Sequence, residues 1–116
     1  PAACAYYDSH QREAVRQAHD DMLARLNEPI TIAQLADRHH LSQTLLKTCF
    51  RQVYGRSIHA FLREQRLRKA AQLLETTGLP VLQVAADVGY GSVSQFGQAF
   101  RRQYGVSPAQ YRRING

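Results

Sequence analysis

The chain is short and basic, which limits what it can be. Its 116 residues suffice for one ordinary domain or two very small ones with a modest core. Hydrophobic residues make up 44% of the chain, which argues against disorder, and no apolar run reaches the roughly 20 residues of a membrane-spanning helix. Fifteen Lys and Arg against nine Asp and Glu give a net charge of +6, which favours a polyanionic partner.

The positive charge is concentrated in the last two-thirds of the chain. Residues 1–38 carry four basic and six acidic side chains (−2), whereas residues 39–116 carry eleven basic and three acidic ones (+8). The two cysteines, Cys4 and Cys49, are too few for a disulfide framework, so we expect an intracellular protein in which Cys49 is a buried thiol. The chain begins at Pro1 without an initiator Met, and we expect a fragment whose missing N-terminal part could hold another domain.

The first predicted helix follows a tail at residues 1–8. Apolar positions recur every three and four residues between capping residues, which predicts an all-α chain. This helix is expected from about Ser9 to Asn27, ending before Glu28-Pro29 because the residue before a proline disfavours helical geometry. The residues on its apolar side are Val15, Ala18, Met22, Leu23 and Leu26. Residues 19–21 (HDD) are expected on its solvated surface.

Six further helices are predicted, so the expected total is seven. Each is opened by a Ser or Thr cap, in three cases with Gln three residues later as a capping box, or by a proline at the first helical position. In chain order the expected limits are Thr31 to about His39, Ser42 to Tyr54, Ser57 to Thr76, Pro80 to about Val88, Ser92 to Tyr104, and about 108–114.

The strongest feature of the sequence is an internal repeat. Residues 50–57 (FRQVYGRS) and 100–107 (FRRQYGVS) are identical at five of eight positions, and residues 34–36 (QLA) match residues 83–85 (QVA). Each copy comprises a short helix, a tight turn and a longer capped helix, which is the outline of a helix-turn-helix. A small helical bundle with a duplicated hairpin is the alternative.

The longer helix of each copy distinguishes these alternatives. Its inward face is expected to consist of Leu45, Leu46, Cys49, Phe50 and Val53 in the first copy, and of Val93, Phe96, Gly97, Phe100 and Tyr104 in the second. Its outward face carries Gln43, Thr44, Lys47, Thr48 and Arg51 in the first copy, and Ser94, Gln95, Gln98, Arg101 and Arg102 in the second. Neither outward face contains an acidic residue, whereas an ordinary solvated helix mixes Glu with Lys. Gln, Lys and Arg instead match base edges and phosphates.

Several motifs at these positions are similar to those of one protein family. They are residues 32–36 (IAQLA), Leu41-Ser42 with Leu46 and Phe50, then Gly55, Ser57, Phe61, Arg66-Leu67 and Ala70, residues 84–96 (VAADVGYGSVSQF), residues 100–108 (FRRQYGVSP), and Tyr111-Arg112. Over residues 9–114 the chain resembles the DNA-binding domain of AraC/XylS-type bacterial transcription regulators. The resemblance implies two helix-turn-helix units, at about 31–55 and 80–105, joined by a linker helix at about 57–76 and followed by a terminal helix at about 108–114.

The resemblance also implies which residues contact promoter DNA. The base-reading residues would be Gln43, Thr44, Lys47, Thr48, Ser94, Gln95 and Gln98. The phosphate-binding residues would be Arg51, Ser57, Arg101, Arg102, Ser107 and Arg112, where the two serines begin helices whose backbone N–H groups face the anion. Many relatives place an aromatic residue or an aromatic–Arg pair where this chain has Thr44 and Thr48, so sequence preference does not transfer.

The sequence therefore predicts sequence-specific binding of double-stranded DNA and transcription regulation in bacteria. The two recognition helices would enter adjacent major-groove segments, because a linker of about 20 residues spans about 30 Å against about 34 Å for one turn of B-DNA. The alternatives are a module contacting RNA polymerase through the acidic first helix, and a protein that coats nucleic acid without sequence preference.

The other expectations concern what the chain lacks and where it works. No Gly-rich phosphate loop, nucleophile motif or metal-ligand spacing is present, and adjacent His39 and His40 cannot share a helix face, so we expect no enzyme, no cofactor and no metal. The fragment is expected to be monomeric, with dimerisation of the full-length protein through its N-terminal domain left open. We expect a cytoplasmic protein, associated with the nucleoid when bound to DNA.

Overall fold

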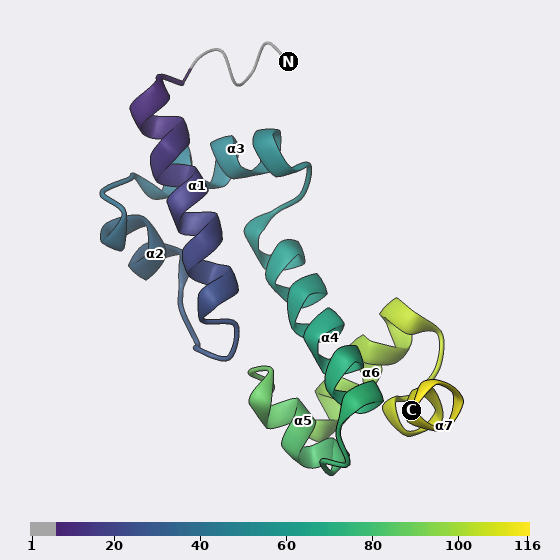
Figure 1. The fold of residues 1–116 in the computed structure, drawn as a ribbon. Coiled ribbons are helices and arrows are strands. Elements are labelled where there is room, and N and C mark those ends of the chain that lie inside the picture. The colour runs from purple at the N-terminus through teal and green to yellow at the C-terminus, as the bar shows by residue number, and fades with distance from the viewer. Residues whose placement is uncertain (1–6) are drawn as a thin grey trace. The chain divides into compact units, whose positions relative to one another are not determined.

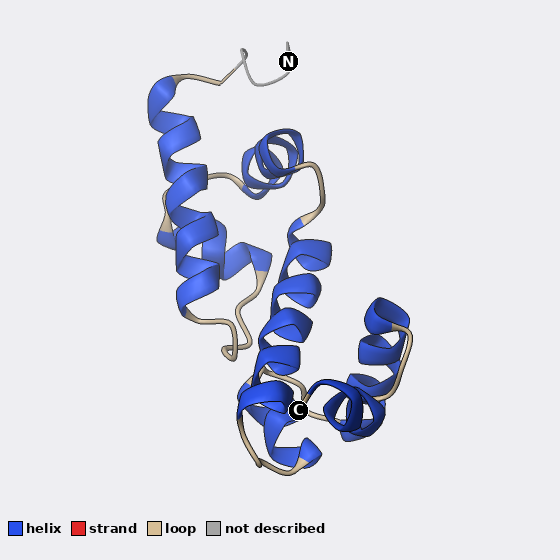
Figure 2. Cartoon of the chain, turned by 45° about the vertical axis from the view of Figure 1, so that its right-hand side comes forward, coloured by secondary structure: helices blue, strands red, loops and turns tan. Residues whose placement is uncertain are grey.

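The fold is all-α, as the sequence predicts (Figure 1). The computed structural model describes residues 7–116, so Cys4 and most of the expected tail lie outside the described residues. Within that range there are seven helices and no strand (Figure 2). The helices are α1 (Ser9–Ala24), α2 (Ile32–Arg38), α3 (Gln43–Tyr54), α4 (Ile58–Thr76), α5 (Val81–Asp87), α6 (Val93–Tyr104) and α7 (Pro108–Asn115). Within residues 7–116, no helix combines the length and the apolar character needed to cross a membrane.

The helix starts follow from the predicted caps. The side chains of Thr31, Ser42, Ser92 and Ser107 each accept a hydrogen bond from the backbone three residues later, and Ser57 Oγ accepts from Ala60 N at 3.2 Å. The capping boxes at Thr31 and Ser107 are complete, whereas the one predicted at Ser92 lacks the return bond from its Gln side chain. Pro80 is the cap before α5 and not its first helical residue.

Helix α1 is shorter than predicted and ends at Ala24. Arg25 leaves the helical conformation (φ −133°, ψ 45°), although the sequence has no glycine or proline near this position before Pro29. The carbonyls of Leu26 and Glu28 accept hydrogen bonds from the Arg66 guanidinium, at 2.7 and 3.1 Å. These long-range bonds hold the segment in a non-helical conformation, which local sequence rules do not anticipate.

The chain forms two compact units. Unit 1 contains the residues up to Arg25 and Pro29–Leu62, and unit 2 contains Leu26–Glu28 and Arg63–Gly116. In unit 1, α3 packs against α1 and α2, and in unit 2, α6 packs against α5 and α7. The largest fully buried side chains of unit 1 are Val15, Met22, Leu35, Leu46 and Phe50, and those of unit 2 are Leu67, Leu74, Val84, Val88, Phe96 and Phe100.

The two copies of the sequence repeat share the same backbone conformation in their turns. In the turn after each short helix, one residue has a positive φ, namely His40 (57°) and Gly89 (91°), and the next residue donates its N–H to the carbonyl five residues back, at 2.8 and 2.9 Å. Each longer helix then ends at a glycine with a positive φ, at Gly55 (78°) and Gly105 (81°). Both copies are therefore a short helix, a tight turn and a longer helix.

Gly89 has close backbone neighbours that leave no room for a side chain, whereas the equivalent position in the first copy carries His40. A Cβ at Gly89 would lie 3.2 Å from both Asn27 Cα and Leu26 O, and 3.3 Å from Arg66 Nε. The segment after α1 therefore packs so closely on this turn that a side chain would displace backbone. Glycine satisfies both the positive φ and the close approach.

Three side chains predicted to pack are exposed. Leu23 has 40% of its surface exposed, Val53 has 44% and Val93 has 39%. Val53 and Val93 each lie three residues from a buried Phe, which is about 60° round the helix and at the edge of the apolar face. Leu23 follows buried Met22 directly and lies about 100° away from it.

The solvated surface expected at residues 19–21 is partly wrong. His19 stacks on Tyr54 with ring centroids 4.4 Å apart and packs against Phe61 at 4.9 Å, so its ring belongs to the aromatic cluster of unit 1. Asp20 does face solvent and pairs with Arg16 at 2.8 Å. The cluster brings together α1, α3 and α4, and such partners are invisible to helical spacing alone.

Asp21 is the second exception, since its side chain is only 11% exposed. Arg38 and His39 each donate to Asp21 Oδ2 at 2.9 Å, and Arg25 lies 3.1 Å from Oδ1. Burial opposes ionisation of this carboxyl group, but the hydrogen bonds from Arg38 and His39 outweigh it and lower the pKa of Asp21 below its usual value. Asp21 thereby ties α1 to the turn between α2 and α3.

Candidate nucleic-acid interface

Helix α3 separates its two faces cleanly. Leu46, Cys49 and Phe50 are buried in unit 1. The side chains expected to contact DNA are all exposed on the other face: Gln43, Thr44, Lys47, Thr48 and Arg51. Unit 1 thus presents the first predicted contact set as one continuous polar surface.

Thr48 is held by two hydrogen bonds on this surface. Its hydroxyl donates to Thr44 O at 2.8 Å, so the Tyr7 hydroxyl, 2.9 Å from Thr48 Oγ1, is the donor in the second bond. The only side-chain donor of Thr48 is therefore used within the protein, which leaves its methyl group and one acceptor lone pair able to contact a base. Sequence reasoning missed Tyr7, because 41 residues separate it from Thr48.

Helix α6 shows the same division in unit 2. Phe96 and Phe100 are buried, while the predicted contact residues Ser94, Gln95, Gln98, Arg101 and Arg102 are exposed. Gln95 donates its backbone N–H to Ser92 Oγ at 3.2 Å, and its side-chain amide does not return to the cap. That amide is therefore available to a ligand.

Two further residues on α6 differ from the sequence prediction. Val93 was expected to pack inward, but it is exposed in the first turn beside Ser94. Gly97 was also expected inward, yet a Cβ at this position would meet nothing within 4 Å. Both residues therefore adjoin the polar face.

The cations on these two faces have no acidic partner in the described part of the chain. Neither helix contains an acidic residue. Among residues 7–116, Lys47, Arg51, Arg101 and Arg102 form no ion pair, whereas Arg16 on α1 pairs with Glu13 and Asp20. The positive charge of α3 and α6 is therefore free to attract an anion.

The predicted phosphate ligands fall into two groups. Arg51, Arg101 and Arg102 are exposed and form no ion pair with any residue that the structure describes. The hydroxyls of Ser57 and Ser107 cap α4 and α7. Arg112 differs, because its half-buried guanidinium donates to Leu74 O and Thr77 O, both at 3.2 Å. Its donors thus hold the end of α4, which a sequence cannot distinguish from an exposed arginine.

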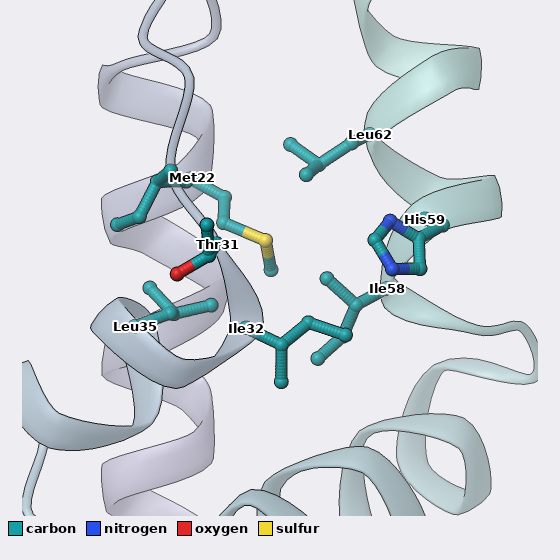
Figure 3. Close-up of a pocket in the computed structure, with 8 residues that line it drawn as sticks. Met22, Thr31, Ile32, Leu35, Ile58, His59 and Leu62 are labelled. Atoms are coloured by element: carbon teal, nitrogen blue, oxygen red, sulfur yellow. The ribbon is translucent and has the colours of Figure 1, made fainter.

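The enclosed gap inside unit 1 is too small to hold a ligand. The gap between α1, α2 and α4 in unit 1 measures about 10 Å³ and is a packing defect lined mainly by Met22, Leu35, Ile58 and Leu62 (Figure 3). Among the described residues, no group of three or more His, Cys, Asp and Glu side chains is arranged to hold a metal ion. The geometry offers two exposed cationic faces and suits an extended polyanion.

Comparisons with known proteins agree with this geometry. A helix-turn-helix domain family matches residues 35–114. The chain is 41% identical over 85 residues to the HTH-type transcriptional regulator AlkR of Acinetobacter baylyi, which covers 73% of this chain and 28% of AlkR, so that relative extends well beyond it. Such relatives are transcription regulators and not enzymes.

Solved structures show the same fold. The C-terminal domain of AraT, a response regulator from Geobacillus stearothermophilus, is similar with a TM-score of 0.84 and 34% identity, over 87% of this chain and 84% of that one. The DNA-binding domain of the global transcriptional factor AdpA, solved in complex with a target DNA, has a TM-score of 0.83 and 33% identity, over 86% of this chain and 90% of that one.

Proposed function

Because the chain belongs to the AraC/XylS family of helix-turn-helix transcription regulators, we propose that it binds double-stranded promoter DNA at specific sequences and regulates transcription in bacteria. The observation that carries this proposal is the pair of exposed, acid-free faces on α3 and α6, whose cations have no partner within the described chain. Four exposed cations without acidic neighbours create a positive potential that attracts the phosphates of DNA.

The base-reading role follows from the chemistry of each face. On α3, Gln43 has the donor and acceptor geometry for adenine, Lys47 donates to guanine, and the methyl groups of Thr44 and Thr48 suit thymine. On α6, Ser94, Gln95 and Gln98 supply the corresponding polar groups. Exposed Val93 adds an apolar contact for a thymine methyl on the same helix.

The phosphate-binding role falls to the cations at the edges of these faces. We assign it to Arg51, Arg101 and Arg102, together with the helix starts at Ser57 and Ser107. Arg112 is the weaker candidate for this role, because two of its five N–H donors are already bound to backbone carbonyls.

Each unit would place its longer helix in the major groove, and the two grooves would be adjacent on one duplex. The linking helix α4 has 19 residues, which gives a length of about 28 Å, close to the roughly 34 Å of one DNA turn. Three further proposals remain. Contact with RNA polymerase would use the acidic first helix of this chain, α1. Dimerisation would require a domain outside this chain, and the location would be cytoplasmic, at the nucleoid.

Selection of bound sequences from a random duplex pool tests this function. We expect a bipartite motif whose halves lie about one helical turn apart. Changing Gln43, Thr44 and Lys47 to Ala should erase one half of the motif, and changing Ser94, Gln95 and Gln98 to Ala should erase the other. Equal affinities of the unchanged chain for selected and random duplex at physiological salt would indicate a nonspecific coating protein instead.

A further inference from the structure

A groove opens between α3 and the start of α4 in unit 1. It has a volume of about 230 Å³ and is lined by Ile32, Lys47, Thr48, Arg51, Ser57, Ile58 and His59. These residues come from α2, α3 and the first turn of α4, so the groove borders the face proposed to read bases.

The floor and the rim of the groove differ in chemistry. Ile32 and Ile58 form the apolar part and point toward each other from α2 and α4 (Figure 3). Lys47, Arg51 and His59 are exposed at the rim, and no acidic residue lines the groove. Three side chains able to carry positive charge, drawn from two helices, therefore surround one hollow.

We propose that this groove seats one phosphodiester group of the bound DNA, with His59 as a phosphate-binding residue beside Arg51. This inference rests on the proposed function. An imidazole N–H donates to a phosphate oxygen, and its protonated form adds a charge. The isoleucine floor suits the adjoining deoxyribose, which is the apolar part of the backbone, and the base next to that phosphate then lies at Lys47 and Thr48.

The second unit shows what this groove adds. The repeat offset of 50 residues pairs Lys47 with Gly97, Arg51 with Arg101, and His59 with Ala109. Only one of the three cationic positions is thus retained in unit 2. Both units are expected to bind phosphate through the equivalent residues Arg51 and Arg101, and the first unit is expected to add a contact from His59 that the second lacks.

Binding measurements on four forms of the chain test the role of His59. Fluorescence anisotropy at fixed pH and salt would compare the unchanged chain with His59→Ala, His59→Lys and a control, His10→Ala, which removes an exposed histidine of α1. We expect His59→Ala to weaken binding about tenfold, because it removes one hydrogen bond to a charged phosphate. The loss should be equal on selected and random duplex, because a phosphate contact does not depend on base sequence. His59→Lys should restore most of the affinity, and His10→Ala should bind like the unchanged chain.

A phosphate-by-phosphate test locates the contact. Single methylphosphonate substitutions in the selected duplex each remove one backbone charge. One substitution in the half read by α3 should weaken the unchanged chain markedly and His59→Ala much less. If the unchanged chain binds the selected duplex and His59→Ala matches it, or if both forms respond equally to every substitution, the groove does not hold a phosphate. Failure of the unchanged chain to prefer the selected duplex would instead refute the proposed function.

Discussion

Replacing Gly97 by Ala separates the stability of unit 2 from its proposed binding role. Gly97 is the fifth of twelve residues in α6, where glycine is less favourable than alanine by about 0.8–1.0 kcal/mol. A Cβ at this position meets nothing within 4 Å, so no steric cost offsets the gain in helix propensity. We therefore expect Gly97→Ala to raise the free energy of unfolding by about 1 kcal/mol, which shifts Tm by roughly 4–8 °C for a unit of this size.

Urea and thermal unfolding followed by circular dichroism measure this gain. Gly105→Ala is the matched control, because its Cβ also meets nothing within 4 Å but its φ of +81° is unfavourable for a side chain. That variant should lose about 1–2 kcal/mol. The same chemical change would then act in opposite directions at two positions of one repeat.

The DNA affinity of Gly97→Ala completes the argument. Gly97 lies beside Gln98 and one turn from Arg101 on the proposed contact face. Since glycine lets a ligand approach the backbone closely, a methyl group added at this position would stand between α6 and a bound duplex. We expect the more stable variant to bind the selected duplex more weakly. Unchanged affinity would show that DNA does not approach α6 at this point, and unchanged stability would refute the reasoning on helix propensity.

Three further substitutions test other parts of the structure. Lys47→Ala should cost about 1–3 kcal/mol of binding and alter base preference, as measured by competition between duplexes, whereas an equal loss on all sequences would reassign Lys47 to the backbone. Asp21→Asn should lower the free energy of unfolding by about 1–3 kcal/mol near neutral pH, because Arg38 and His39 lose their ionised acceptor. Folding lowers the pKa of Asp21, so the stability that its carboxylate contributes is present above the usual carboxyl pKa and is lost as pH falls through the lowered pKa. The free energies of unfolding of the two forms should therefore converge in acid. A difference between them that does not change with pH would contradict the assignment. Phe100→Ala should cost about 3–5 kcal/mol, because Phe100 is fully buried, and an unaltered Tm would contradict the packing of unit 2.

The sequence predicted most of the fold because its signals are local. Caps such as Thr31 and Ser107 and the spacing of Phe96 and Phe100 act within one or two helical turns, and the repeat supplied the same pattern twice. The polar residues of α3 and α6 were also found, because their exposure follows from the same spacing.

The misses share one cause, which is contact between residues distant in the chain. Tyr7 reaches Thr48 across 41 residues, and Arg66 reaches Leu26 across 40. The hydrogen bond from Arg112 to Leu74 O was likewise not predicted, because 38 residues separate the two. Such contacts redirect individual side chains without changing the order or type of the helices.

Leu26–Glu28 belong to unit 2, although they precede most of unit 1 in the chain, so unit 2 is not one continuous segment. A C-terminal fragment that begins after Leu62 would lack the two carbonyl acceptors of Arg66 and the close backbone neighbours of Gly89. Each lost hydrogen bond should lower the free energy of unfolding by about 0.5–1.5 kcal/mol. A C-terminal half expressed alone should therefore be less stable than the same half within the intact chain, unless a peptide of residues 26–28 and its flanks is supplied with it.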